Sequence, residues 1–337
     1  MDREGARKPQ GDPRMSEVDR RKARVAMLSV ASNSTLVVLK VIIGLAIGSV
    51  SVISEAIHSG VDLLAAVIAF LAVKIAGKPA DRDHPFGHGK VENISGTIEA
   101  LLIFFAAGWI IYESAQKLSH QEPLESVGWG VGVMLVSSIV NLFVSRMLFK
   151  VGEATESVAL LADAWHLRTD VYTSAGVMVG LGLIWLGGIF FPALDLRWID
   201  PVAAIGVALL IFKAAYDLTI QSARDLLDAA LTEEELSTIR SEILSLAPRV
   251  RGAHALKTRR SGSERFAELH LLVDAGLSVD ESHRITEETT KRLQKRFSSI
   301  RVTIHVEPCA GDCRPHCVSG CFLAEDDRNL VRRRHES

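Results

Sequence analysis

Several common functional signatures are missing from this sequence of 337 residues, and cysteine does not occur before Cys309. The segment Gly87-His88-Gly89-Lys90 lacks the first glycine of a Walker A loop, so ATP-driven chemistry is not expected. The H-E-x-x-H motif of zinc proteases is absent as well, which argues against a metalloprotease. The formal net charge of −2 gives no reason to expect a nucleic-acid partner.

Long apolar runs fill the middle of the chain, whereas both ends are rich in charge. Crossing a bilayer as a helix takes about 20 predominantly apolar residues. Six segments are long enough, namely 25–48, 51–76, 92–118, 126–149, 156–189 and 199–222. The first is not a cleavable signal peptide, because it is too long and further spans follow it. We therefore predict an all-helical membrane domain over residues 20–228.

The distribution of lysine and arginine predicts how these spans are oriented. One side of the predicted bundle carries Arg20, Arg21, Lys22, Arg24, Lys74, Lys78, Arg82, Lys90, Arg146 and Lys150, and the other side carries Lys117 and Arg197. Loops rich in basic residues face the cytoplasm. The expectation is a multi-pass protein of the cell (inner) membrane with cytoplasmic N- and C-termini.

A small soluble domain is predicted after the last span, over residues 229–308. Thr232 and the acidic residues that follow it are typical of a helix start, and an amphipathic helix is expected over 278–297. Strands are predicted over 255–260, 266–273 and 300–306. The order helix–strand–strand–helix–strand indicates an α+β domain. Residues 1–19 and 324–337 are expected to be disordered.

Two predicted spans contain nearly the same polar pattern, 108 residues apart. His58 and Asp62 lie four residues apart in the second span, and His166 and Asp170 repeat this spacing in the fifth. Residues i and i+4 share one face of a helix. Two such helices brought together would supply two imidazoles and two carboxylates, a set that suits tetrahedral Zn(II).

The alternative for this repeat is a pair of hydrogen-bonding patches between helices. Each ionised side chain in the middle of a bilayer costs about 2.5–3.5 kcal/mol on insertion scales. Four ionisable groups in matched positions therefore favour a metal or proton site. Glu55 and Asp163, a turn before each histidine, are weaker ligand candidates.

With this repeat and the loop motif Asp81-Arg82-Asp83-His84-Pro85-Phe86-Gly87-His88-Gly89-Lys90, the chain resembles the cation diffusion facilitator family over about residues 20–308. The resemblance implies six transmembrane helices, a cytoplasmic ferredoxin-like domain, a homodimer, and export of divalent metal in exchange for protons. The two-histidine, two-aspartate set resembles that of zinc-selective members. Imidazole favours Zn(II) over hard cations, and Fe(II), Co(II) and Cd(II) stay open.

Further ligand sets lie in the loop and in the soluble domain. Asp81, His84 and His88 could form a three-ligand site, and the alternative is a polar turn whose histidines cap a helix. The resemblance assigns these residues to a second metal site and places a two-metal site in the soluble domain at the dimer interface. The residues expected in the soluble domain are His254, His270, His283, His305 and Glu307. The family's usual last ligand is aspartate, and scattered surface histidines are the alternative. The resemblance also suggests an ion pair between Lys90 and Asp228.

All four cysteines lie in the C-terminal extension, over residues 309–337, which is also basic. Cys309, Cys313, Cys317 and Cys321 follow a C-x3-C spacing that differs from the common C-x2-C zinc pairs. On the predicted topology they face a reducing compartment, which argues against disulfides. A soft-metal or iron–sulfur site is one hypothesis, and a flexible tail with unpaired thiols is the other.

The sequence thus predicts a secondary transporter rather than an enzyme. The expected activity is proton-coupled efflux of divalent metal, with Zn(II) as substrate and regulatory ligand. The partners expected are a second copy of the chain, the lipid bilayer and protons. The alternatives are a membrane-bound metal sensor or scaffold that transports nothing, and an exporter whose main substrate is Fe(II), Co(II) or Cd(II).

Overall fold

The structure is a computed structural model that describes residues 16–47, 50–119, 129–190, 198–297, 299–309, 313 and 315–336. The chain divides into two compact units, Met1–Leu226 and Leu227–Ser337.

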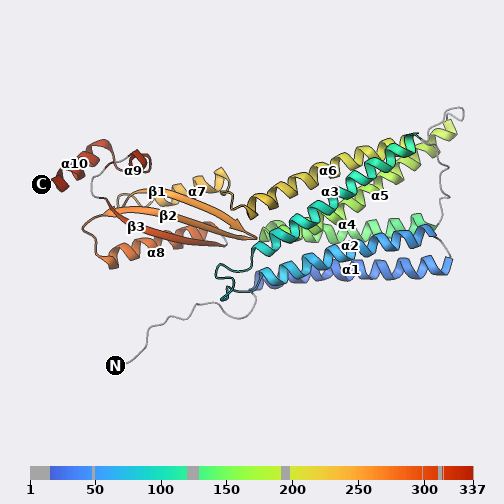
Figure 1. Ribbon diagram of the computed structural model, residues 1–337, viewed down its shortest axis with the longest axis horizontal. Helices are drawn as coiled ribbons and strands as arrows, with labels where there is room; N and C mark the ends of the chain where they lie inside the picture. The colour runs from blue at the N-terminus through green and yellow to red at the C-terminus, as the bar shows by residue number, and fades with distance from the viewer. Residues whose placement is uncertain are drawn as a thin grey trace, which may run out of the picture. The chain divides into compact units, whose positions relative to one another are not determined.

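The first unit is a bundle of long helices that run side by side (Figure 1). Its helices are α1 (Glu17–Ile47), α2 (Val50–Ala76), α3 (Lys90–Ser119), α4 (Trp129–Thr155), α5 (Val158–Phe190) and α6 (Ile199–Leu226). Within the described ranges, α1, α2, α3, α4 and α6 are long and apolar enough to cross a membrane. Helix α5, with 33 residues, is the longest element of the bundle. The six predicted spans thus correspond to α1–α6.

Large apolar side chains cover the outside of this bundle. Leu45, Phe105, Trp109 and Leu210 are between 66% and 71% exposed, which a protein surrounded by water would avoid. The inside is packed with small residues such as Ala100, Ala162 and Ala164. At Gly96, an added Cβ would lie 2.6 Å from Val158 Cγ1 and 3.2 Å from Ser222 Oγ. Glycine is therefore needed where α3 approaches α5 and α6.

A buried ionic cluster joins the starts of α1, α3 and α5. The side chains of Lys22 and Glu92 are each 2% exposed, and Lys22 Nζ lies 3.0 Å from Glu92 Oε1. The hydroxyl of Ser157 donates to the other oxygen, Glu92 Oε2, at 2.5 Å. Because the pair is buried, removing either residue would leave the other charge without compensation and destabilise the bundle.

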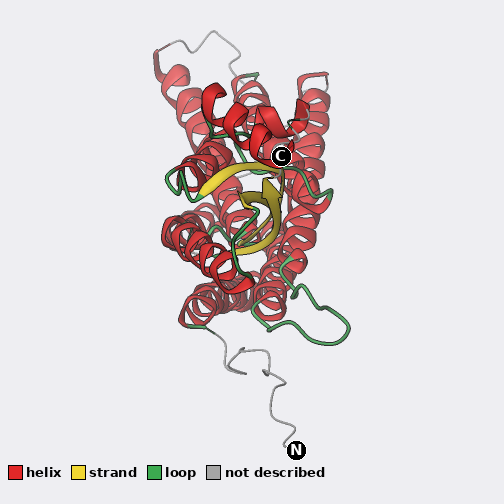
Figure 2. Cartoon of the chain, turned by 90° about the vertical axis from the view of Figure 1, so that its left-hand side faces the viewer, coloured by secondary structure: helices red, strands yellow, loops and turns green. Residues whose placement is uncertain are grey.

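The second unit contains the predicted α+β domain. Its elements are α7 (Glu233–Leu244), β1 (Val250–Ser261), β2 (Glu264–Asp274), α8 (Val279–Arg296) and β3 (Ile300–Cys309). The strand order is β1-β2-β3, with β1 antiparallel and β3 parallel to β2. Figure 2 shows the three strands as one curved sheet. The predicted order of helices and strands is confirmed, and β1 begins earlier than expected.

Capping boxes begin both helices of this domain. Thr232 and Glu235 form one at α7, and Ser278 and Glu281 form another at α8. The apolar faces of the helices join the sheet in one core, to which Ile239, Ile243, Leu269, Leu271, Ile285 and Leu293 contribute. The sequence signals that start these helices were local, which is why their N-termini were predicted correctly.

Two predictions of disorder are wrong for residues that the structure describes. Helix α1 already begins at Glu17, where Ser16 Oγ accepts a hydrogen bond from the Asp19 amide. A helix, α10 (Glu325–Glu336), occupies most of 324–337, with three acidic residues in its first turn. Acidic residues stabilise a helix N-terminus, so a charge-rich segment can still be helical.

The C-terminal extension docks on the edge of the sheet. A short helix, α9 (Pro315–Ser319), precedes an isolated bridge between Cys321 and Gly252 of β1. The Ala253 amide donates to the Gly320 carbonyl at 2.9 Å, and the Phe322 amide donates to the Arg251 carbonyl at 2.8 Å. The extension thus satisfies backbone groups of the edge strand β1.

Candidate metal centres

The first candidate centre lies between α2 and α5. Asp62, His166 and Asp170 each offer one ligand atom, and these three atoms lie within 4.8 Å of one another. His166 Nε2 lies 3.1 Å from Asp62 Oδ1, so the imidazole and the carboxylate of the two helices already interact. The side chain of Asp62 is 7% exposed and that of His166 is 13% exposed. A carboxylate–imidazole–carboxylate set with this spacing can hold a divalent cation.

The side chain of the fourth predicted ligand, His58, lies outside the described residues. Its backbone belongs to α2, one turn before Asp62. The side chain of Glu55, the weaker candidate on the same helix, also lies outside the described residues. Asp163 is described and fully buried on α5, and it does not belong to the three-residue cluster.

A polar cavity of about 100 Å³ adjoins this centre. It is lined by Asn33, Leu36, Lys40, Ser59, Asp62, Ser137, Ser138, Asn141, Asp170, Thr173 and Ser174. Asn141 Nδ2 donates to Asp170 Oδ2 at 3.4 Å, and Lys40 Nζ donates to Ser59 Oγ at 2.6 Å. The cavity gives a small hydrated ion polar contacts next to the cluster.

Most of these cavity-lining residues were not singled out from the sequence. Asp62 and Asp170 are predicted ligands, and Asn33 and Asn141 stand out as polar residues within apolar spans. Apart from Leu36 and Lys40, the others are small hydroxyl residues that also occur on ordinary helix faces. The recurrence of polar residues at helical spacing, as with Asn33 and Lys40 seven residues apart, is the signal that could have found more of the lining.

The second candidate centre lies in the loop between α2 and α3. Asp81, His84 and His88 each offer a ligand atom within 4.8 Å of the others. His88 Nε2 lies 3.2 Å from Asp81 Oδ2, and the two imidazole centroids are 4.4 Å apart. The Nδ1 atom of His88 is buried and has no hydrogen-bond partner in the described part of the chain.

Backbone hydrogen bonds hold Asp81 in its ionised form. Its Oδ1 atom accepts from the amides of His84, at 2.7 Å, and Asp83, at 3.0 Å. The His84 amide in particular lowers the pKa of Asp81 below 3.8, although desolvation acts in the opposite direction. An ionised carboxylate beside two imidazoles has the chemistry of a metal ligand set.

The third candidate centre lies on the sheet of the second unit. His254, His270 and Glu307 form a cluster with ligand atoms within 4.8 Å of one another. His254 Nε2 is 3.2 Å from Glu307 Oε2, and His270 Nδ1 is 2.8 Å from Glu307 Oε1. Glu307 thus bridges the two histidines, one carboxylate oxygen on each.

The other two histidines of this domain lie differently. The rings of His305 and His270 are tilted against each other with centroids 4.9 Å apart, and His305 Nε2 is 3.8 Å from Glu307 Oε1. It therefore lies beside the cluster. His283 is on α8, 67% exposed and 3.6 Å from Glu287 Oε1, and it does not belong to the cluster in this chain.

The four cysteines of the extension are half-buried and unoxidised. Among the described residues, they do not form a group of three or more ligand atoms within 4.8 Å. Cys309 ends β3 opposite Asp274, whereas Cys321 bridges to β1, so the docking on the sheet separates them. The single metal site hypothesised for the four cysteines therefore stays a prediction.

The ion pair expected between Lys90 and Asp228 also stays a prediction. Lys90 Nζ donates to the Leu226 carbonyl at 3.3 Å, at the end of α6. Asp228 Oδ1 lies 3.5 Å from Arg259 Nη1 within the second unit.

Comparison with known families identifies both units. Residues 26–227 match the cation efflux transmembrane domain, and residues 231–309 match the cytoplasmic domain of cation efflux proteins. The chain therefore belongs to the cation efflux family, also called the cation diffusion facilitator family. Members of this family are transporters in membranes rather than enzymes.

Relatives match over most of the chain. An uncharacterized transporter of Synechocystis sp. is 34% identical over 283 residues, which is 84% of this chain and 89% of the relative. The cation-efflux pump FieF of Klebsiella pneumoniae is 32% identical over 288 residues, which is 85% of this chain and 92% of the pump.

Solved structures resemble the second unit. The metal-bound C-terminal domain of the CzcD transporter from Thermotoga maritima is 34% identical, covering 23% of this chain and 94% of that domain, with a TM-score of 0.22. The cytosolic domain of a cation diffusion facilitator family protein is also 34% identical, covering 23% of this chain and 98% of that domain, with a TM-score of 0.21.

Proposed function

We propose that this transporter exports divalent metal, with Zn(II) as its main substrate, in exchange for protons. The observation that carries the proposal is the convergence of Asp62, His166 and Asp170 from α2 and α5 beside a polar cavity. His58 would complete the set as the fourth ligand. Two imidazoles and two carboxylates favour a borderline cation over Mn(II) or Mg(II).

Metal ions and protons compete for the same ring nitrogen, and this competition couples metal export to proton import. Metal binds neutral imidazole and ionised carboxylate, so loading the site releases protons. His166 Nε2, which faces Asp62 Oδ1 at 3.1 Å, holds either a proton or the metal ion. Rocking of the bundle would expose the site to the cytoplasm and to the outside in turn, and protons from outside would displace the metal.

The cytoplasmic sites are proposed to bind regulatory metal in a homodimer. Asp81, His84 and His88 would hold one ion on the loop, and His254, His270 and Glu307 would hold another on the sheet. Each set supplies nitrogen and oxygen ligands suited to Zn(II). The proposed topology places both termini in the cytoplasm and the bundle in the cell membrane.

Zinc uptake into proteoliposomes with a pH gradient tests the transport proposal. Asp170→Asn keeps the shape of the side chain and removes one charged ligand, so uptake is expected to fall to the level of empty liposomes. Asp217→Asn, on the exposed face of α6, is the matched control and should transport normally. Undiminished uptake by Asp170→Asn would contradict the site.

The same assay separates the alternatives. Parallel uptake measurements with Fe(II), Co(II) and Cd(II) identify the preferred metal. If wild-type protein binds zinc but moves none of these ions under any pH gradient, the chain is a metal sensor or scaffold.

A further inference from the structure

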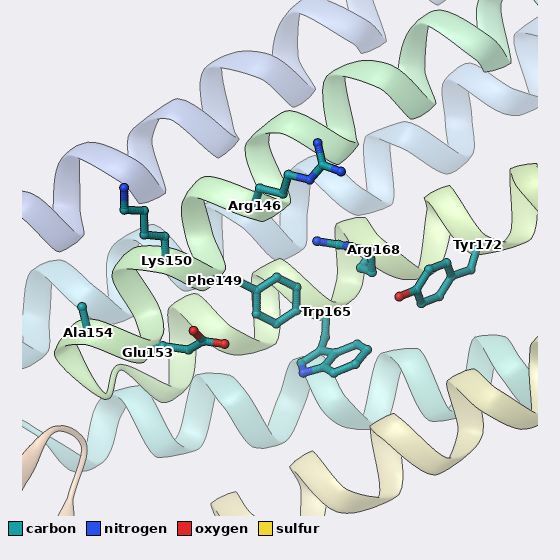
Figure 3. Close-up of a pocket in the computed structure, with 8 residues that line it drawn as sticks. All are labelled: Arg146, Phe149, Lys150, Glu153, Ala154, Trp165, Arg168 and Tyr172. Carbon is teal, nitrogen blue, oxygen red and sulfur yellow. The ribbon is translucent and has the colours of Figure 1, made fainter.

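A second pocket lies on the flank of the bundle, formed by α4 and α5. Its volume is about 790 Å³, and it is lined by Arg146, Phe149, Lys150, Glu153, Ala154, Trp165, Arg168 and Tyr172 (Figure 3). Three of these residues are basic and three are aromatic. The proposed transport mechanism uses none of them.

The basic residues of this pocket have no acidic partner. Arg146, Lys150 and Arg168 form no ion pair within the described ranges, and the buried Nε atom of Arg168 has no hydrogen-bond partner there. In Figure 3 the two arginine side chains lie at the same end of the pocket, and Glu153 lies at the other end. Two arginines that no carboxylate neutralises make this end a site for an anion, and Lys150 adds a third positive charge to the pocket lining.

The remaining wall of the pocket is aromatic. The Phe149 and Trp165 rings meet edge to face with centroids 5.3 Å apart, and the Arg168 guanidinium lies 5.3 Å from the Phe149 ring. Tyr172 extends this wall along α5 (Figure 3). A ligand that carries an anion next to apolar chains fits such a pocket better than a free ion does.

Both helices carry a long uncharged segment that ends beside the pocket. Residues 171–190 of α5 carry no charge and span about 30 Å as a helix. Arg168 comes just before this segment. Side chains in a helix tilt toward its N-terminus, so Arg168 extends toward the α4–α5 turn, the direction in which a long basic side chain reaches the headgroups. On α4, residues 129–145 are also uncharged, and Arg146 follows them directly.

We propose that this pocket binds the phosphate of an anionic glycerophospholipid, with the acyl chains along Phe149, Trp165 and Tyr172. Basic pockets between membrane helices bind such headgroups. Arg168 lies between His166 and Asp170 on α5, so the bound lipid contacts the helix that carries part of the transport site. The proposal does not depend on which metal is transported.

The first test measures lipid binding by the purified full-length protein. Phosphatidylglycerol is titrated into detergent micelles, and bound lipid is counted by native mass spectrometry, with phosphatidylcholine as the neutral lipid. Each basic residue near an anionic lipid contributes about fivefold to affinity, so Arg146→Gln with Lys150→Gln should weaken binding about 30-fold. Arg24→Gln, an exposed cation on α1, is the control and should bind as wild type does.

Two outcomes of this test overturn the proposal. Equal retention of phosphatidylglycerol and phosphatidylcholine would show that the pocket does not recognise the phosphate charge. If inorganic phosphate displaces phosphatidylglycerol and by itself raises thermal stability as much as the lipid does, the site is one for free anions.

A second measurement leaves the basic residues of the pocket unchanged. Trp165 lines the pocket, so phosphatidylglycerol with brominated acyl chains should quench its fluorescence more than brominated phosphatidylcholine does. The contribution of Trp165 is isolated by subtracting the signal of Trp165→Phe. Equal quenching by both lipids would contradict the proposal.

Discussion

Glu235 shows how a single side chain can make this protein sensitive to pH. Its Oε1 atom accepts hydrogen bonds from Arg260, at 2.7 Å, and from Arg265, at 2.8 Å. Partial burial by itself raises the pKa of Glu235, but the Thr232 amide and the two arginines outweigh burial and lower the pKa below 4.5. Folding therefore favours the ionised carboxylate.

We expect Glu235→Gln to lower the free energy of unfolding by about 2 kcal/mol at neutral pH. Because the folded pKa is depressed, the contribution of Glu235 is complete above the unfolded value of about 4.5 and is lost as pH falls through the folded value. The difference in the free energy of unfolding between variant and wild type should thus disappear at acid pH. Unfolding followed by circular dichroism across this pH range measures the difference.

Glu234→Gln is the matched control for this prediction. Glu234 occupies the same first turn of α7 and is exposed, so its replacement tests the effect of the helix dipole without the arginine pair. If the free energy of unfolding of Glu235→Gln stays below that of wild type by the same amount down to acid pH, the prediction is contradicted.

At the scale of helices, the buried pair of Lys22 and Glu92 connects α1 to α3. Glu92→Gln leaves the ammonium of Lys22 buried without its closest carboxylate, and we expect a loss of about 3 kcal/mol in stability. The double variant Lys22→Met with Glu92→Gln removes both charges and should recover part of that loss. Thermal unfolding of the full chain in detergent micelles measures all three proteins.

The control for this cycle is Arg24→Met, an exposed cation on the same helix. Its effect should stay within about 0.5 kcal/mol, as for most surface substitutions. If Glu92→Gln is as mild as Arg24→Met, the pair does not hold the helices together.

Helices and strands with local signals were predictable from the sequence. The i, i+4 pairing of His166 with Asp170 and the capping residue Thr232 depend only on neighbours in the chain. The docking of Gly320 and Cys321 on β1 was not predictable, because it depends on backbone groups of Arg251 and Ala253 that are about 70 residues away. Nor was helix α10, whose charge-rich composition resembles that of a disordered segment.

For the candidate centres, residue types were easier to predict than partners. Asp81 and Glu307 were identified by their positions next to histidines, and the structure places each within 3.2 Å of a ring nitrogen. That His283 lies apart from the other histidines was not predictable, because it depends on how α8 packs on the sheet. The pocket around Arg168 needed the packing of α4 against α5.

For the whole molecule, binding of metal to the cluster of His254, His270 and Glu307 should raise the free energy of unfolding. A ligand that binds only the folded state at 100 times its dissociation constant adds about 2.7 kcal/mol. Zinc should therefore raise the unfolding temperature of the full chain, and a chelator should reverse the effect. Glu307→Gln removes the carboxylate that bridges His254 and His270, so the zinc-dependent shift should shrink.

Glu268→Gln, which removes an exposed carboxylate on β2, is the control and should keep the full shift. Because zinc can also bind the loop and membrane centres, the informative quantity is the difference between the two variants. Equal shifts in both would place the stabilising metal elsewhere.

The connection between α4 and α5 is very short. Only Glu156 and Ser157 separate the two helices, Glu156 has a positive φ of 52°, and the Ser157 amide donates to the Gly152 carbonyl at 2.9 Å. We therefore expect the two helices to move together. A movement of α5 that displaces His166 and Asp170 also displaces Arg146 and Lys150 on α4. A lipid bound in the pocket would then either move with both helices or slow their movement.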